Sequence, residues 1–514
     1  MKKILSLLVF VLPAIFVSAQ NDVKWTRIDS PKEKYDFKYF ISTSPEASKA
    51  VFTIPHNKPF QQTKHNIFIR NYNSDLSNFS ETGIPPESPV TLFLAGFRDY
   101  TVISGSMDEN KNPMAQFAKE NMIVIADDKM NPLVVKTFPL HGKKNKFTGS
   151  PELYLSHDST HLIVVNNEIL AFDKPSLKEP PKMTYIDVYD KSLNHVWSDS
   201  VNFNTIFGEK TDINNYSMDF VGGKLILTAS CPSDGMKKIK ATVYLVAFDK
   251  PQSYKIIWNQ IFPYENLAYR TVVGPQGNII ISGANMMGSN APFGQAKKQL
   301  FFLNKDLKNT EAEPVFKSYE LDKTFVAKYP EYKMFLAESL LGPFDLFLLG
   351  DRVVYASEHR YYSTSTSSSG SSSTTYYFKH ITLLCFDNEG QIEWLNMINK
   401  SVASKQSFDD HFCNGFVSGN NLCFFYYDYA DNIAAAKFIE KPRFVGEDKL
   451  WVTQAIVSPD GDIKKTMITN IGAHDIRANL SATQQVNDHR FILVGTGTSL
   501  SSLGGYFGIY ELDK

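Results

Sequence analysis

Few residues of this sequence have the types and spacing that metal or nucleophile chemistry needs. His157 and His161 flank a turn in HDSTH, but two histidines do not complete a structural zinc site, which takes four ligands. The acidic turns at 127–128 and 460–462 hold fewer oxygens than the six to eight that calcium binds. HExxH, Cys-x-x-Cys, Walker-type and GxSxG motifs are absent. We therefore predict no metal and no cofactor, and we assign no catalytic residue.

The cysteines are the next candidates for chemistry. Cys231, Cys385, Cys413 and Cys423 are few for an oxidising compartment, so disulfides are not the framework of the fold. Cys413 and Cys423 flank a predicted hairpin turn and are candidates for one disulfide, provided that register and geometry match. In the alternative interpretation, all four cysteines are small buried apolar residues.

One segment is a candidate binding loop, residues 361–377, which read YYSTSTSSSGSSSTTYY. Its Ser/Thr/Gly centre has too little apolar surface to order itself, so we predict a flexible loop. Tyr361, Tyr362, Tyr376 and Tyr377 bracket it and could form an aromatic-edged binding site. The alternative is an inert hairpin extension, which the frequency of tyrosine in strands favours.

The elements that must position such residues are recurrent hairpins. Each is an apolar strand, a short turn of Gly, Asn, Asp or Ser, and a second apolar strand, as in MDFVGGKLILTAS (218–230) and DLFLLGDRVVYAS (345–357). Eight copies follow one another at intervals of about 50–75 residues, which indicates one repeat architecture. Their turns lie at Pro45, Arg98, Asp158, Gly223, Gly277, Gly350, Gly419 and Asp488.

A second hairpin follows most copies, and its last strand often carries tryptophan, as in YIDVYDKSLNHVWSD (185–199). Two hairpins make a four-stranded antiparallel unit, and such units repeated around an axis form a β-propeller. We therefore predict an all-β propeller of eight four-stranded blades, with seven as the alternative. A string of sandwich domains would need linker-like breaks, and the sequence has none.

The tryptophan half-repeat resembles a known class of propeller. In CFDNEGQIEWLNM and VYDKSLNHVWSDS an acidic turn precedes an apolar strand with Trp, a pattern similar to the quinoprotein-like and WD-type propeller repeats. The resemblance extends over most of the chain, although each motif is short. Quinone-binding members carry a Gly-rich, Trp-docking motif in nearly every blade, whereas here Trp occurs only in some. The resemblance thus implies the architecture and none of the cofactor residues.

The N-terminus indicates export. Lys2 and Lys3 precede an apolar run at 4–16, and small residues precede Gln20, so residues 1–19 are predicted to be a cleavable signal peptide. The run is short for a membrane span, which needs about 20 apolar residues. We expect a periplasmic or extracellular protein in which residues 20–514 form a single propeller domain. A helical insertion at 329–342 and the flexible loop at 361–377 interrupt it.

The two ends of the domain are predicted to share a blade. The final strand, at 506–514, lacks a following tryptophan strand, and DVKWTRI (22–28) has Trp25 where HVWSD and IEWLN have Trp197 and Trp394. The N-terminal strand should therefore complete the last blade and close the ring.

Composition limits the function without defining it. Lys plus Arg is 53 and Asp plus Glu is 54, a balance without the basic footprint of a nucleic-acid or anionic-membrane binder. We expect a monomeric binding or scaffold propeller with a protein or glycan ligand. The alternative is a hydrolase or lyase at the channel mouth, where residues from several blades would converge. A quinone-dependent dehydrogenase is a third, weaker possibility.

Overall fold

The computed structural model describes most of the chain, with gaps. The described residues are 23–27, 36–44, 47–53, 67–73, 78–84, 93–97, 100–107, 120–126, 132–139, 146–148, 152–158, 160–170, 183–192, 194–208, 213, 215–232, 240–263, 266–287, 297–330, 340, 343–366, 372–404, 413–433, 449–498 and 505–512. The predicted signal peptide lies outside these residues, as does most of the predicted helix at 329–342, so both stay predictions. No helix in this part of the chain is long and apolar enough to cross a membrane.

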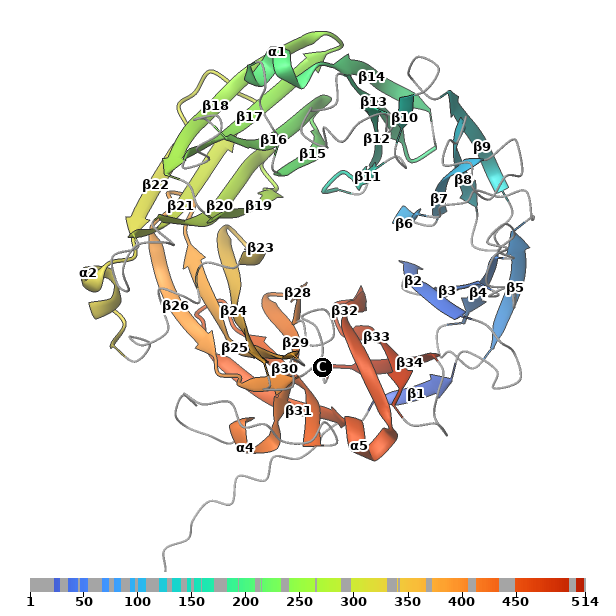
Figure 1. Cartoon of the computed structure of the whole chain (residues 1–514), viewed down its shortest axis with the longest axis vertical. Helices are drawn as coiled ribbons and strands as arrows, with labels where there is room; N and C mark the ends of the chain where they lie inside the picture. The colour runs from blue at the N-terminus through green and yellow to red at the C-terminus, as the bar shows by residue number, and fades with distance from the viewer. Residues whose placement is uncertain are drawn as a thin grey trace, which may run out of the picture.

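The described strands form eight antiparallel sheets around a ring (Figure 1), which confirms the predicted propeller. We number these blades in chain order. Blade 1 holds β2 (Asp36–Ser44), β3 (Ala47–Thr53), β4 (Ile67–Tyr72) and β5 (Phe79–Ile84). Blade 2 holds β6 (Phe93–Phe97), β7 (Tyr100–Met107), β8 (Glu120–Ala126) and β9 (Pro132–Pro139). Blade 3 holds β10 (Lys146–Thr148), β11 (Glu152–Leu155), β12 (His161–Leu170), β13 (Thr184–Asp190) and β14 (His195–Val201).

Blades 4 to 6 continue the same pattern. Blade 4 holds β15 (Asn215–Val221), β16 (Lys224–Pro232), β17 (Lys240–Lys250) and β18 (Ser253–Pro263). Blade 5 holds β19 (Asn266–Val273), β20 (Asn278–Met287), β21 (Lys297–Asp306) and β22 (Val315–Glu320). Blade 6 holds β23 (Pro343–Leu349), β24 (Arg352–Thr366), β25 (Ser372–Phe386), β26 (Ile392–Ile398) and the short β27 (Val402–Ser404).

The last two blades bring the chain back to its start. Blade 7 holds β28 (Asn414–Ser418), β29 (Asn421–Tyr429), β30 (Leu450–Val457) and β31 (Ile463–Asn470). Blade 8 holds β32 (Ile476–Asn487), β33 (Arg490–Gly497), β34 (Gly505–Glu511) and β1 (Lys24–Arg27). Short helices lie between strands: α1 (Phe203–Phe207), α2 (Lys323–Ala327), α4 (Ala430–Ile433) and α5 (Ile471–His474).

The N-terminal strand closes the ring as predicted. β1 pairs antiparallel with β34, and Trp25 lies opposite Gly508. A Cβ atom added at Gly508 or at Gly495 would lie 2.9 Å from the nearest Trp25 ring atom, so the two glycines leave the space that the indole fills. Segments from opposite ends of the chain therefore share one sheet.

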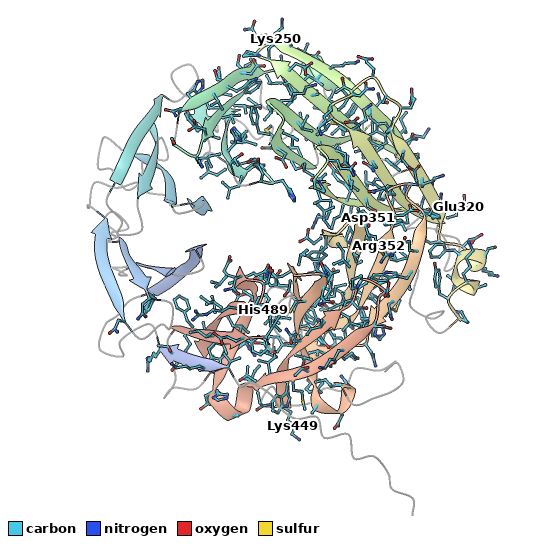
Figure 2. The ribbon with its side chains drawn as sticks, turned by 180° about the vertical axis from the view of Figure 1, so that it is seen from behind. Lys250, Glu320, Asp351, Arg352, Lys449 and His489 are labelled. Atoms are coloured by element: carbon cyan, nitrogen blue, oxygen red, sulfur yellow. The ribbon has the colours of Figure 1, made fainter. Side chains whose placement is uncertain are left out.

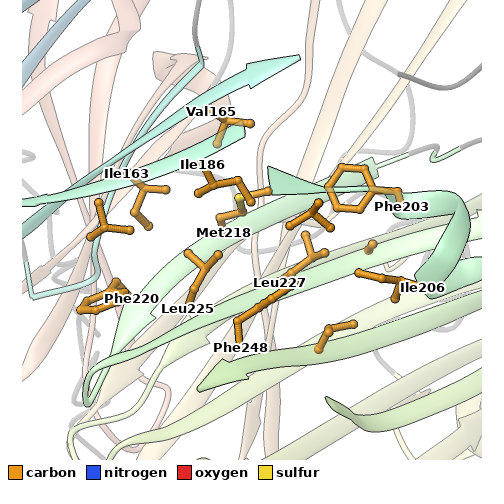
Figure 3. Close-up of a cluster of buried hydrophobic side chains, with 14 of the residues drawn as sticks. Ile163, Val165, Ile186, Phe203, Ile206, Met218, Phe220, Leu225, Leu227 and Phe248 are labelled. Atoms are coloured by element: carbon orange, nitrogen blue, oxygen red, sulfur yellow. The ribbon is translucent and has the colours of Figure 1, made fainter. Parts of the chain in front are cut away.

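Apolar side chains that alternate along the strands hold neighbouring blades together. Between blades 3 and 4, Ile163 and Ile186 meet Leu225, Leu227 and Phe248 (Figure 3), all at most 1% exposed. Side chains at every second strand position share a face, so blades 3 and 4 each turn one apolar face toward the other. Burial of such faces is the dominant favourable term in the stability of the ring.

Polar ties hold the hairpin-turn ends of the blades. Arg352, which follows the β23–β24 turn (Figure 2), bonds Glu393 at 2.6 Å and the carbonyl of Pro459 in blade 7 at 2.9 Å. Trp394 Nε1 donates to the same carbonyl at 2.9 Å. Its ring lies 2.9 Å from where a Cβ of Gly461 would be, and Gly461 has φ +88°, so only glycine suits that turn. The tryptophan of this half-repeat thus docks under the turn of the next blade.

Candidate functional site

The hairpin β24–β25 extends beyond the rest of its blade. β23 pairs with β24 only as far as Ser357, whereas β24 and β25 stay paired from Tyr361–Tyr377 to Thr366–Ser372. We call residues 361–366 and 372–377 the ribbon. The prediction of a flexible loop across 361–377 is corrected here, because strand covers all of it except 367–371, which lie outside the described residues. The pairing ladder of the blade continues into the segment, and its Thr and Tyr residues suit strands.

The ribbon brings the four predicted tyrosines together. Tyr361 lies opposite Tyr377, and their rings stack with centroids 4.6 Å apart and an interplanar angle of 14°. Tyr362 lies opposite Tyr376, with centroids 6.2 Å apart at 47°. Directly opposite residues share a face of an antiparallel pair. The sequence therefore identified tyrosines that pair across the ribbon, but the two pairs lie on opposite faces of it, and their role in binding stays a prediction.

The four rings differ in exposure and support. Tyr376 packs on the apolar cluster between blades 7 and 8, and the ammonium of Lys379 lies 5.3 Å from the centroid of the Tyr361 ring, a cation–π contact. Tyr362 is 63% exposed, against 37% for Tyr361. Tyr362 is thus the side chain that the ribbon presents outward, and its neighbours hold the ribbon in place.

Beneath the ribbon, the interface between blades 6 and 7 becomes polar. The carboxylate of Glu358, on β24, forms an ion pair with Lys400, and both side chains have no solvent exposure. Arg360 Nε lies 3.6 Å from the other oxygen of Glu358. Lys400 also lies 5.6 Å from the Phe378 ring and 6.0 Å from the Tyr426 ring. A buried ion pair carries a large desolvation cost, so it stabilises a fold only while both partners are present.

Asp428, on β29, is the second buried charge of this interface. Its Oδ1 accepts hydrogen bonds from Asn432 Nδ2 at 2.6 Å and from the Tyr429 amide at 2.9 Å. Burial raises the pKa of Asp428 to about 6, although these hydrogen bonds and the charge of Lys465 lower it in part. His380, on β25, is the converse case, because burial and nearby positive charge lower its pKa to about 3. At neutral pH, His380 is therefore uncharged.

Several oxygens of the same interface have no hydrogen-bond partner among the described protein atoms: Ser401 Oγ, Tyr426 Oη, Asp428 Oδ2 and Thr453 Oγ1. Buried polar atoms of this kind are usually satisfied by ordered water. We call Glu358, His380, Lys400, Asp428 and these oxygens the polar interface. Sequence reasoning missed it, because no motif joins its residues. Its signal in the sequence was a pair of charged residues, Glu358 and Arg360, directly after the predicted apolar hairpin at 345–357.

The inner strands carry charged residues that tie adjacent blades. The His157 amide donates to Asp219 of blade 4 at 3.1 Å, and Arg270 of blade 5 donates to the Phe344 carbonyl of blade 6 at 3.0 Å. Burial raises the pKa of Asp219 and of Asp345, while the charge of Arg270 acts in the opposite direction on Asp345.

A cavity of about 50 Å³ lies between blades 4 and 5, lined by His157, Ser217, Asp219, Thr228 and Thr271 among others. It has room for a few water molecules. His157 and His161 do not converge, because the His161 ring packs on Phe220 with centroids 4.6 Å apart. In the part of the chain that the structure describes, no three His, Cys, Asp or Glu side chains group as metal ligands.

The candidate disulfide between Cys413 and Cys423 is not formed. All four cysteines are free and buried. Asn414 lies opposite Phe425 and Phe416 lies opposite Cys423, so Cys413 is three ladder positions from Cys423, or about 10 Å at the rise of a strand. The two side chains also pack in different apolar clusters. The alternative interpretation, small buried apolar residues, describes them.

Comparisons with known proteins show similarity of fold alone. No protein-family model and no curated protein matches the sequence. The polysaccharide lyase Uly1 is similar at 8% identity and a TM-score of 0.40, over 94% of this chain and 91% of that one. The Dos1 propeller is similar at 9% identity and a TM-score of 0.40, over 96% of both chains. Prolyl oligopeptidase B from Galerina marginata is similar at 8% identity and a TM-score of 0.38, over 90% of this chain and 55% of that one.

Proposed function

We propose that this protein is an exported binding or scaffold propeller that holds a protein or glycan ligand on the tyrosines of the ribbon. The observation that carries the proposal is Tyr362, which is 63% exposed on a paired strand, while its cross-strand neighbour Tyr376 is partly buried against an apolar cluster. Export rests on the sequence pattern at 1–19. The likeness to quinoprotein-like and WD-type repeats stays a prediction.

The chemistry of the ribbon suits recognition. Tyrosine offers a large flat surface and a hydroxyl at low conformational cost, since only two side-chain torsions are fixed on binding. A strand that is already paired loses little backbone entropy when a ligand docks. The exposed ring of Tyr362 can contact the apolar face of a sugar ring or an aromatic side chain.

The experiment compares the full chain with Tyr362→Ala on a printed glycan array and against a phage-displayed peptide library. For a probe that binds, we expect Tyr362→Ala to weaken the affinity by about 10–30-fold. Tyr254→Ala is the matched control, since Tyr254 is also exposed, at 40%, but lies on β18 of blade 4. An equal loss in both variants, or no loss in Tyr362→Ala, would contradict the proposal.

A hydrolase or lyase at the inner strands is the second candidate. It is favoured by the carboxyls of Asp219 and Asp345, whose pKa values are both raised by burial, as those of acid catalysts often are. Incubation of the full chain with a panel of polysaccharides and peptides would reveal new reducing ends or amines. That release should disappear in Asp219→Asn or Asp345→Asn if either carboxyl is the acid.

A further inference from the structure

The cavity between blades 4 and 5 is a polar gap in an apolar interface. The two blades meet in a cluster of buried apolar side chains that includes Ile226. Ile226 also lines the cavity of about 50 Å³, whose walls carry the carboxyl of Asp219 and the hydroxyls of Ser217, Thr228 and Thr271. Polar groups inside an apolar contact are costly unless something satisfies them. This group therefore requires an explanation other than packing.

The register of the strands brings the polar side chains together. Ser217 and Asp219 lie two positions apart on β15 and so share a face of blade 4. Thr228 lies directly opposite Ser217 on β16, which places it on the same face. From blade 5, Thr271 Oγ1 lies 3.5 Å from Ser217 Oγ. One carboxyl and three hydroxyls thus meet at one place between the blades.

The charge of Asp219 is met by dipoles alone. Its Oδ1 accepts hydrogen bonds from the His157 amide at 3.1 Å and from the Phe220 amide at 2.7 Å. Among the described residues, no hydrogen bond reaches its Oδ2 and no Lys or Arg forms an ion pair with it. Burial raises the pKa of Asp219, and the two amides and His157 lower it only in part. The protein therefore supplies no permanent positive charge for this carboxylate.

The size and the oxygens of the cavity suit a small cation. A volume of about 50 Å³ holds a few water molecules and is too small for a whole sugar ring. Hard cations are bound by carboxylate and other oxygen ligands together with water. One carboxylate balances one positive charge, whereas a divalent cation would keep an uncompensated charge in a largely buried place. A monovalent cation matches both the ligands and the charge.

We propose that this cavity binds a monovalent metal cation, sodium or potassium, on Asp219 Oδ2 and the three hydroxyl oxygens beside it, with water completing the coordination. The cation would join β15 and β16 of blade 4 to β19 of blade 5. The proposal does not rest on the ribbon. A bound cation would hold the carboxyl of Asp219 ionised, which would leave Asp345 as the acid of the hydrolase or lyase candidate.

The test is thermal unfolding of the full chain at pH 8 in NaCl, KCl or choline chloride. Equal ionic strength makes the general screening of charges the same in all three salts, and choline is too large for the cavity. We expect NaCl or KCl at about 200 mM to raise the unfolding temperature by about 2–3 °C over choline chloride. Asp219→Asn keeps an acceptor for the two amides but loses the charge, so this rise should disappear.

Asp345→Asn is the matched control. Asp345 is also a partly buried carboxyl on an inner strand, and it accepts a hydrogen bond from the amide of the next residue at 2.8 Å. It does not line the cavity, so its variant should keep the full rise. Thr228→Val removes one proposed ligand at nearly constant shape, and should weaken the affinity for the cation by about tenfold.

Hydrogen exchange in the same salts locates the effect. NaCl or KCl should slow exchange in β15 and β19, because the cation opposes local opening of these strands, and should leave blade 7 unchanged. If Asp219→Asn does not fold, this measurement and Thr228→Val decide. Equal unfolding temperatures of the wild type in the three salts would overturn the proposal, as would a rise that Asp219→Asn retains. A rise in CaCl₂ alone would contradict the charge argument and overturn it too.

Discussion

Two inter-blade interfaces of this ring are built differently. Between blades 3 and 4 the buried contact is apolar, from Ile163 to Phe248, and a polar tie such as that from the His157 amide to Asp219 lies at its exposed end. Between blades 6 and 7 it is apolar at the end near the β23–β24 turn, where Val354 and Leu383 meet Phe424, and charged at the end beneath the ribbon, where Glu358 meets Lys400. The same repeat therefore tolerates buried charge where the ribbon is attached. The lesson is that an interface between blades can be built without buried charge, so the charged end requires a separate explanation.

The largest expected effect comes from breaking the buried ion pair. Lys400→Met should lower the free energy of unfolding by about 3–5 kcal/mol, because Glu358 would stay buried without its closest cation and with Arg360 at 3.6 Å. Denaturant unfolding measures it. The control is the double variant Glu358→Gln/Lys400→Met, which removes both fully buried charges and should recover most of the loss. A cost under about 1 kcal/mol for Lys400→Met would mean that the pair is solvated.

The apolar interface should respond through cavity formation alone. Leu227 is fully buried between blades 3 and 4, and Leu227→Ala should cost about 3 kcal/mol. The cost should be the same at pH 5 and pH 8, since no titratable group is exposed by the change. Denaturant unfolding measures this cost. If the cost of Leu227→Ala differed strongly between pH 5 and pH 8, titratable groups would contribute to this interface as they do between blades 6 and 7.

Asp428 should make the fold less stable as the pH rises from about 4 to 6. Its folded pKa of about 6 lies above its ordinary value of 3.8. Asp428 therefore favours the fold below pH 3.8, and this contribution is lost as the pH rises through 6. Asp428→Asn keeps the acceptor for Asn432, and should be more stable than the wild type by about 2–3 kcal/mol at pH 8. The two proteins should converge near pH 4; equal stability at pH 8 would contradict the raised pKa.

His380 should make the fold less stable as the pH falls, which is the opposite pH dependence to that of Asp428, and its effect near neutral pH should be smaller. Its folded pKa of about 3 lies below the ordinary 6.5, so its stabilising contribution is present above pH 6.5 and is lost as the pH falls toward 3. His380→Gln should therefore lose about 2 kcal/mol less than the wild type between pH 7 and pH 5. If both proteins lost the same free energy of unfolding between pH 7 and pH 5, the lowered pKa of His380 would be ruled out.

The repeat could be predicted from sequence because each hairpin is local. Alternating apolar residues around turns such as Gly350, which has φ +67°, fix a strand pair within about a dozen residues. The Trp25 strand could also be placed, because its tryptophan matches the repeat at Trp197 and Trp394. The prediction of a flexible loop at 361–377 was wrong because composition measures only what a segment can bury by itself. It does not show that the strand pairing of the blade continues into the segment.

The polar interface could not be predicted, for a different reason. Glu358 lies on β24, Lys400 lies between β26 and β27, and Asp428 lies on β29 of the next blade, so they are brought together only by the assembled sheets of blades 6 and 7. Their pKa shifts come from burial, which depends on that packing. The disulfide prediction failed in a similar way, since the spacing of Cys413 and Cys423 says nothing of their register in the hairpin.

The pairing of β1 with β34 has a consequence for the time course of folding. Roughly 480 residues separate the two strands, and at about 5–20 residues per second of synthesis the first strand waits about half a minute or longer for its partner. Until then, blade 8 has no outer strand and the ring is an open arc with an unpaired edge at either end. A chain that is translocated across a membrane before it folds would avoid this exposure, because β1 and β34 would then both be present when folding begins.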